Sequence, residues 1–276
     1  MISTSSGGGR GRRQSTLLGL RQELPRSYRW AATFGGVLAI VALWGLASTV
    51  WATGTSFSVP TFASTWDALV EMENDGTLFT DLAASLQRVV IGYGLALAFG
   101  VAIGVLMGSF GSATAFLEPQ VGFLRYIPAS ALTPLFLIWM GIDETPKVAL
   151  IIAGTIFYVI LMTADVVRAV PMALINAAYT LGAGRLTIIR RVIMPHSWPG
   201  IIDVARINLA AAWLMLVVAE LLAAQDGLAF RIIRAQRFRA IDRMFALLLI
   251  FGLLGLASDL FLRWLRKRSA PWAEQS

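Results

Sequence analysis

The stretch that decides the fold is NAAYTLGAGRLTIIRRVIMP, from Asn176 to Pro195. It is polar, cationic and rich in small residues, yet it lies between two apolar runs that are each long enough to span a membrane. A polar segment in that position must lie at a membrane surface. Its pattern predicts a short amphipathic helix, a break at Gly182, a second short helix and a stop at Pro195.

The composition indicates a membrane protein. Of the 276 residues, 57% are hydrophobic and only 14% are charged, whereas a soluble domain has about 25% charged residues. The sequence has no Cys, which excludes disulfides, thiolate metal sites and a Cys nucleophile. The only histidine is His196, which nearly excludes a histidine-rich metal site. The net charge of +7 is best explained by basic flanks of membrane helices rather than by nucleic-acid binding.

The apolar runs predict an all-α membrane protein with six transmembrane helices in one domain, residues 30–268. The expected helices are about 30–52, 86–108, 117–140, 147–167, 199–223 and 243–265. The polar loop between the fourth and fifth covers 168–198. Residues 1–29 are rich in Ser, Gly and Arg and are expected to form a disordered basic tail; an RNA-binding arm is an alternative without aromatic support. Residues 269–276 form a second tail.

The charges around these spans predict their orientation. Basic residues favour the cytoplasmic side, so the arginine-rich tail places the N-terminus inside, and six spans return the C-terminus to the cytoplasm. The arginines of the 168–198 loop and the closing RWLRKR (263–268) agree. Residues 53–85 have acidic residues but no Lys or Arg, and are therefore expected outside, with a short helix between Pro60 and Asp75.

One segment disagrees with this orientation. Residues 225–243 fall outside but contain five arginines, of which Arg231, Arg234 and Arg237 recur every three residues. This spacing puts them along one side of a helix. We expect an amphipathic helix at the outer interface, whose cationic face could contact lipid phosphate, a docked partner or an incoming anion.

Small and polar residues inside the spans indicate close helix packing and a passage. GYGLALAFGVAIGVLMG (92–108) places small residues so that helices can approach closely. Glu220 is either a structural carboxylate bonded to a neighbouring span or part of a gate. Asp259 and Arg263 are spaced for an ordinary ion pair within one helix. The residues expected to line a translocation path are Arg125, Pro128, Trp139, Asp165, Asn208 and Glu220.

Residues 172–195 resemble the EAA loop of permease subunits of bacterial ABC importers. That pattern is E-A-A, three residues, Gly, nine residues, then I-x-L-P. Here Asn176-Ala177-Ala178 stands for E-A-A, Gly182 follows at the right spacing, and Val192 to Pro195 stand for the last four positions. Asn in place of the first Glu removes a negative charge that could pair with a partner.

The wider chain, roughly residues 55–270, resembles the nitrate/sulfonate/taurine branch of these permeases. The resemblance is carried by SLQRVVIGYGLAL (85–97), RYIPASALTPLFLIWMGI (125–142), ARINLAAAWLMLVVAELL (205–222) and Gly227 to Ala229. It implies the type I ABC importer permease fold and a location in the bacterial cytoplasmic membrane. It also implies a homo- or heterodimer of permeases, two cytoplasmic ATPase subunits and an extracytoplasmic solute-binding protein.

In such an importer the 168–198 loop docks the ATPase, so that closure of the ATPases pulls directly on the fourth and fifth spans. Ile175, Ala178 and Leu181 give the first short helix a partly apolar face, which suits insertion into a groove. The residues expected to form the docking element are Asn176, Ala177, Ala178, Leu181, Gly182, Arg185 and Pro195.

No nucleotide-binding motif such as G-x-x-x-x-G-K-[ST] occurs in the sequence. We therefore expect no cofactor and no catalytic site in this chain, with ATP bound by the partner ATPase. The expected cargo is a small solute, favoured as an anion such as nitrate, a sulfonate or bicarbonate. An ion-coupled secondary transporter is the alternative, although no repeated halves are visible. A membrane enzyme would need a polar cluster that the sequence lacks.

Overall fold

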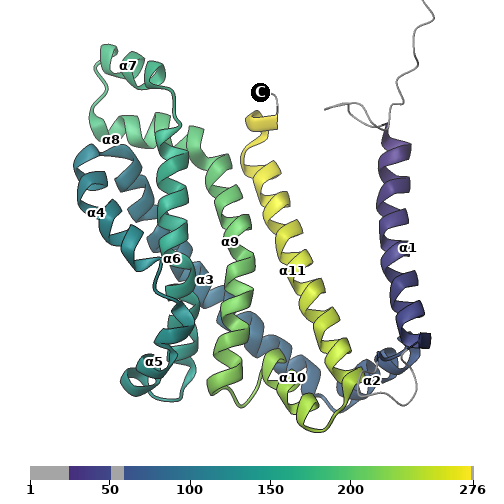
Figure 1. Ribbon diagram of the computed structural model, residues 1–276. Coiled ribbons are helices and arrows are strands. Elements are labelled where there is room, and N and C mark those ends of the chain that lie inside the picture. Colours follow the sequence, from purple (N-terminus) through teal and green to yellow (C-terminus); the bar gives the residue numbers. More distant parts are fainter. Residues whose placement is uncertain (1–24, 51–58, 275–276) are drawn as a thin grey trace, which may run out of the picture. The chain divides into compact units, whose positions relative to one another are not determined.

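The structure is a computed structural model that describes residues 25–50 and 59–274 (Figure 1). All regular secondary structure in this described part is helical. The chain divides into two compact units, one ending at Phe62 and the other beginning at Ala63. Residues 1–24 of the predicted tail lie outside the described residues. The last four residues of that tail, 26–29, belong to α1, which begins at Arg26.

The first unit contains α1 (Arg26–Val50), the first of the predicted spans. Most of its aliphatic side chains are exposed, as a helix surrounded by lipid requires. Near the end of α1, the indole nitrogen of Trp44 donates a hydrogen bond of 2.9 Å to the carbonyl oxygen of Pro60. The Trp44 ring also packs against Phe62, with ring centroids 4.1 Å apart. These two contacts hold Pro60 and Phe62 against α1.

The second unit contains the other helices. They are α2 (Phe62–Asn74, whose first residue is the last of the first unit), α3 (Thr77–Ser109), α4 (Gly111–Leu124), η1 (Ala129–Leu132), α5 (Thr133–Met140), α6 (Glu144–Arg168), α7 (Met172–Thr180), α8 (Arg185–Ile188), the π-helical η2 (Ile189–Ile193), α9 (Met194–Ala223), α10 (Leu228–Arg237), α11 (Ile241–Ser269) and η3 (Pro271–Glu274).

Among the described residues, five helices are long and apolar enough to cross a membrane, and a sixth crossing is possible if α4, η1 and α5 form one broken span. The two halves of that span are bent by 78°. The sequence predicted one span over about 117–140, and the structure breaks this range after Leu124. Pro128 explains the break, because proline lacks an N–H and disfavours a helical conformation at the residue before it, Ile127.

Helices α3 and α6 pack closely along a stripe of small residues. Gly92, Gly100, Gly104 and Gly108 recur at multiples of four along α3 and face α6. A Cβ atom at Gly104 would lie 2.6 Å from Cβ of Thr163, and one at Gly100 would lie 2.7 Å from the Val159 side chain. Only glycine permits these approaches, so the close packing predicted from residues 92–108 is confirmed.

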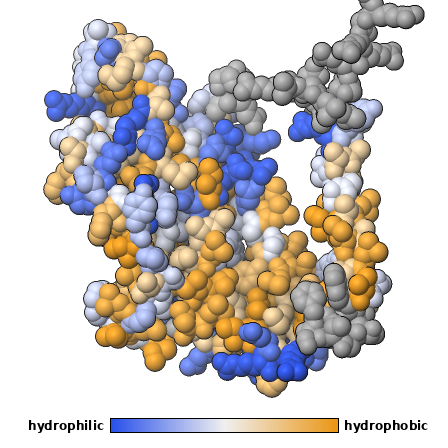
Figure 2. All heavy atoms as spheres, viewed as in Figure 1, coloured by the Kyte–Doolittle hydropathy of each residue, from blue (hydrophilic) through white to orange (hydrophobic). Residues whose placement is uncertain are grey.

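Helix α9 completes the core of the second unit. Val89 and Tyr93 of α3 and Ile151 of α6 pack with Trp213 and Leu216 of α9. The Tyr93 hydroxyl donates a hydrogen bond of 2.5 Å to the carbonyl oxygen of Ala205 in α9. Figure 2 shows apolar residues gathered over the middle of α9 and α11, with hydrophilic residues near both ends of these helices. That distribution suits a bundle embedded in a bilayer.

Candidate functional site

The predicted docking loop lies at one end of the second unit, at the same end as the C-terminus of α11 (Figure 1). Helix α7 ends at a glycine cap. Gly182 has φ +78°, its N–H bonds to the carbonyl oxygen of Tyr179 at 2.9 Å, and the N–H of Ala183 bonds to that of Ala178 at 3.0 Å. This is a Schellman cap, in which glycine adopts the left-handed conformation at little cost. The predicted break at Gly182 is therefore present.

The docking loop has its own small core. Ile175 and Ala178 of α7 pack inward against a cluster that contains Val167, Ile188 and Ile193. The prediction that these two residues share an outward apolar face with Leu181 is wrong, because they hold α7 against the bundle. The outward apolar side chains are instead Met172, Leu174, Tyr179, Leu181 and Leu186, and Leu181 is 87% exposed.

Pro195 does not end a second short helix, contrary to the prediction. The chain stays helical from Arg185 to Ala223, with a π-helical turn over Ile189–Ile193 just before the proline. A π-turn accommodates the N–H that Pro195 lacks. Figure 1 shows α8 lying across the end of the bundle before α9 turns to run along it. Pro195 in the first turn of α9 and Pro199 inside it are residues of the kind that bends a helix.

The other residues predicted to dock a partner are accessible. Asn176 and Ala177 of α7, Arg185 of α8 and Pro195 are all exposed, and Ala178 is half-buried. All of the predicted docking residues except Ala178 are therefore accessible to a partner.

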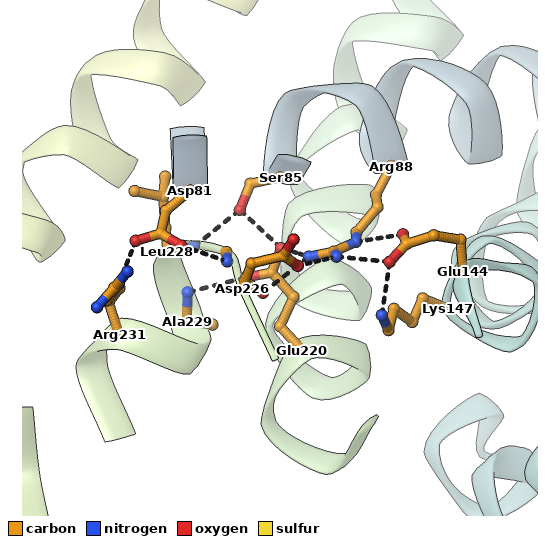
Figure 3. Close-up of polar contacts among 11 residues, drawn as sticks. Asp81, Ser85, Arg88, Glu144, Lys147, Glu220, Asp226, Leu228, Ala229 and Arg231 are labelled. Atoms are coloured by element: carbon orange, nitrogen blue, oxygen red, sulfur yellow. Dashed lines mark hydrogen bonds and ion pairs between the residues drawn. The ribbon is translucent and has the colours of Figure 1, made fainter. Parts of the chain in front are cut away.

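A buried ion network occupies the opposite end of the bundle, where α3, α6 and α9 meet the loop before α10 (Figure 3). Arg88 of α3 is at its centre and is 2% exposed. Its guanidinium donates two bonds of 2.7 Å to the carboxylate of Glu144, one of 2.9 Å to Glu220, and bonds to both the carboxylate and the carbonyl oxygen of Asp226. All five N–H donors of Arg88 are therefore used.

The carboxylate of Glu220 also has hydrogen-bond partners on both of its oxygens. One carboxylate oxygen accepts bonds from Arg88 and from the Ser85 hydroxyl, the latter at 2.6 Å, and the other accepts the backbone N–H of Ala229 at 2.9 Å. Of the two roles left open by the sequence, the geometry is that of a structural carboxylate bonded to a neighbouring span. Lys147 adds a second cation, 2.7 Å from Glu144.

The first residues of α10 are held by the same network. The N–H of Gly227 donates to Asp81 at 2.8 Å, and the N–H of Leu228 donates to the Ser85 hydroxyl at 2.9 Å. Asp81 also pairs with Arg231. Carboxylates at a helix N-terminus are favoured by the helix dipole, so Asp81 and Glu220 fix where α10 begins.

Helix α10 is the amphipathic helix that the arginine spacing predicted. Its apolar side, including the fully buried Leu228, packs on Met72 of α2 and Leu247 of α11. Its cationic face is partly neutralised, since Arg231 pairs with Asp81. Arg243, in the first turn of α11, lies 2.7 Å from Glu71.

The residues predicted to line a translocation path do not form one cluster. Arg125 and Pro128 line a common cavity, whereas Glu220 belongs to the ion network. Asn208 is buried and donates to the carbonyl oxygen of Val204 at 3.0 Å. Trp139 is exposed on α5. Asp165 is exposed near the docking loop, 3.5 Å from Arg168.

A second ion-pair group ties α9 to α11 near the docking loop. The predicted pair of Asp259 and Arg263 is present at 2.7 Å. Sequence reasoning missed its extension, in which Arg206 of α9 bonds to Asp259 at 3.0 Å and to Asp203 at 3.1 Å.

Sequence reasoning also missed Arg88, Ser85, Glu144 and Lys147 as one site. The available signal was Arg88 itself, a lone charge within an apolar run, which is costly unless it is paired. Its partners are 56, 132 and 138 residues away, and no periodicity in the sequence connects them.

Comparison with known proteins gives consistent matches. Residues 96–270 match the family described as binding-protein-dependent transport system inner membrane component. An ABC transporter permease protein of Brucella abortus is 40% identical over 73% of this chain and 81% of its own length. The taurine transport system permease protein TauC of Escherichia coli is 36% identical over 72% of each chain. The bicarbonate transport system permease protein CmpB of Synechococcus elongatus is 28% identical over 70% of each.

Solved structures show the same fold. A chain of the MetNI methionine ABC transporter in an inward-facing conformation matches with a TM-score of 0.62 and 18% identity, over 70% of this chain and 96% of that one. A chain of a bacterial ABC transporter involved in the import of alginate matches with a TM-score of 0.58 and 16% identity, over 88% of this chain and 96% of that one.

Proposed function

This chain belongs to the family of binding-protein-dependent transport system inner membrane components, and we propose that it forms the path by which a small oxyanion enters the cell. As the permease subunit of an ABC importer, it works with an ATPase and a solute-binding protein. We assign ATP binding to the ATPase, so that this chain needs no cofactor and has no catalytic site of its own. The working complex contains two permeases and two ATPase subunits.

The observation that supports this function best is the docking loop. The loop presents exposed apolar side chains from α7, from Leu181 and from α8, and it stands on its own buried cluster, as an element bound by another protein requires. Because α8, η2 and α9 form one helical segment, a force applied to the loop reaches the middle of the bundle through backbone hydrogen bonds.

The distribution of charge supports a cytoplasmic docking loop. Arg185, Arg190 and Arg191 belong to the loop, and the closing run of basic residues in α11 lies at the same end of the bundle (Figure 1). Basic residues favour the cytoplasmic side, so both the loop and the C-terminus are assigned there. We assign the N-terminus to the same side.

The substrate class is proposed from the relatives. Their names give taurine, which carries a sulfonate, and bicarbonate. Both are small solutes with a compact, negatively charged group of oxygen atoms. Arg234 and Arg237 on α10 form no ion pair with a carboxylate of the described residues, and they would attract such an anion to the outer mouth by long-range electrostatics.

The test is ATP-dependent uptake by proteoliposomes that contain the permease, its cognate ATPase and its binding protein. We expect uptake of at least one of taurine, nitrate and bicarbonate, and none of a neutral pyrimidine. Leu181→Asp should abolish uptake and weaken ATPase binding, while the apolar Leu181→Met should preserve both. Uptake of the pyrimidine alone would refute the oxyanion assignment, and normal uptake by Leu181→Asp would refute the docking role.

A further inference from the structure

The break between α4 and η1 opens a cavity midway along the bundle. The cavity has a volume of about 280 Å³ and is lined by Arg125 and Pro128 from the break, Gly154 and Tyr158 from α6, and Met215 from α9. Gly154 and Tyr158 lie near the centre of α6, and Met215 lies in the long apolar part of α9. In Figure 1, α4 and α5 lie towards opposite ends of α6, so that the break falls between the two ends.

Arg125 has an unusual environment for an arginine among membrane-spanning segments. Its guanidinium lies 4.9 Å from the centre of the Tyr126 ring and donates to the Tyr126 hydroxyl at 3.1 Å. Its Nε atom is buried and has no hydrogen-bond partner in the described chain. No carboxylate of the described residues forms an ion pair with it, although Arg88 and Arg206 on neighbouring helices each bond to two or more.

An uncompensated cation at this depth is costly, and such residues mark substrate and ion pathways. A structural arginine would be neutralised as Arg88 is. The cost is offset if an anion occupies the cavity for part of the transport cycle, since a guanidinium offers parallel N–H donors that match two oxygens of a planar or tetrahedral oxyanion.

We infer that Arg125 is the contact through which the permease itself holds the oxyanion as it passes, in the cavity that Pro128, Tyr158 and Met215 complete. The inference rests on the proposed function and adds a site within this chain. Tyr126 stacks against the guanidinium and keeps its hydroxyl proton free to donate. The Tyr158 hydroxyl donates a hydrogen bond of 3.4 Å to the Arg125 carbonyl oxygen, which stabilises the backbone conformation at the break. An anion held by a single charged contact of this kind can dissociate as readily as it binds, as conduction requires.

The experiment uses the complete importer in proteoliposomes, with saturating binding protein and taurine, nitrate or bicarbonate as probes. Arg125→Gln removes the charge with little change in length, Arg125→Lys keeps the charge but loses the paired donors, and Tyr158→Phe removes the bond to the break. Arg268→Gln, an exposed arginine near the end of α11, changes the net charge equally and is the control. Two readouts are measured: uptake per permease, and ATPase activity stimulated by the binding protein.

We expect Arg125→Gln to lower uptake of the transported anion by about tenfold or more, the loss of one charged hydrogen-bonded contact, with stimulated ATPase activity within about twofold of the parent. Uptake by Arg125→Lys should lie between that of the parent and that of Arg125→Gln. Uptake by Tyr158→Phe should be mildly lowered, and uptake by Arg268→Gln should match the parent.

Normal anion uptake by Arg125→Gln would overturn the site while leaving the proposed function intact. Parallel loss of uptake and stimulated ATPase activity would overturn it too, by giving Arg125 a structural or coupling role. If the parent importer takes up none of the three anions, the proposed function fails and this site fails with it.

Discussion

The α-carbon of Gly227 faces the carboxyl group of Glu220 so closely that a Cβ atom at 227 would lie 2.5 Å from Cδ of Glu220. Gly227 also has φ +110° and ψ 159°, a region of backbone conformation that is essentially restricted to glycine. Two independent constraints thus demand glycine at the loop that closes the buried ion network.

We therefore predict that Gly227→Ala lowers the thermal unfolding midpoint of the purified permease. Backbone strain costs about 1–3 kcal/mol, and the steric conflict with Glu220 adds about 1–3 kcal/mol. Gly141→Ala is the matched control, since Gly141 has φ +82° and ψ −165° but nothing within 4 Å of the added atom. Equal shifts for the two variants would show that contact with Glu220 is unimportant.

The second prediction concerns Arg88 and Glu220 as a coupled pair. Arg88→Met leaves Glu220 buried without its counter-charge and should destabilise the permease by about 3–5 kcal/mol. Glu220→Gln should also destabilise it, but adding Glu220→Gln to Arg88→Met should cost less than it does alone. Unfolding midpoints of the two single variants and the double variant measure this coupling. The exposed pair of Arg243 and Glu71 is the control, and Arg243→Gln should cost about 0–1 kcal/mol. Simple additivity would contradict the network.

The third prediction concerns the cap of α7. Gly182→Val strains the left-handed position at φ +78° without a steric clash, because nothing lies within 4 Å. The permease should insert and assemble, but α7 should be misdirected and ATP hydrolysis uncoupled from uptake. Gly184→Ala, at a residue with φ −74° and equally open surroundings, should behave as the parent. Normal coupling in Gly182→Val would argue against a defined orientation of α7.

The fourth prediction concerns the packing of α3 on α6. Gly104→Ala places a methyl group 2.6 Å from Cβ of Thr163 and 2.7 Å from the Ile160 carbonyl oxygen, and should cost about 1–3 kcal/mol. Gly94→Ala on the same helix meets nothing within 4 Å and should be neutral or slightly stabilising. The two unfolding midpoints, measured in the same detergent, test whether the stripe carries the packing.

Local signals predicted the parts of the fold that depend on neighbouring residues. Apolar length located the spans, a four-residue recurrence of small residues located the α3–α6 contact, and the spacing around Gly182 located the docking loop. Two local signals were misjudged. Pro128 was included in a span drawn over 117–140, although Arg125-Tyr126-Ile127-Pro128 breaks it. Pro195 was read as a stop, although a preceding π-turn lets the helix continue.

The ion network could not be assembled from the sequence, because it is a property of tertiary structure. Asp81 looked like one acidic residue among several in an outer segment, and Arg231 like one arginine of a cationic face. Their pairing requires α3 and α10 to meet across 150 residues of chain. A charge within a span shows that a partner must exist, but the identity of the partner follows only from the packing of the helices.

The turn between α8 and α9 divides the helical segment from Arg185 to Glu220 into a short arm and a long arm. Its short arm runs about 15 Å across the end of the bundle and its long arm about 30 Å along it, at 1.5 Å per residue. If this segment moves as one body, a tilt of the short arm displaces Glu220, at the far end of the long arm, about twice as far as it displaces Arg185. Movement of a protein bound at α8 would then reach the buried ion network at the opposite end of the bundle.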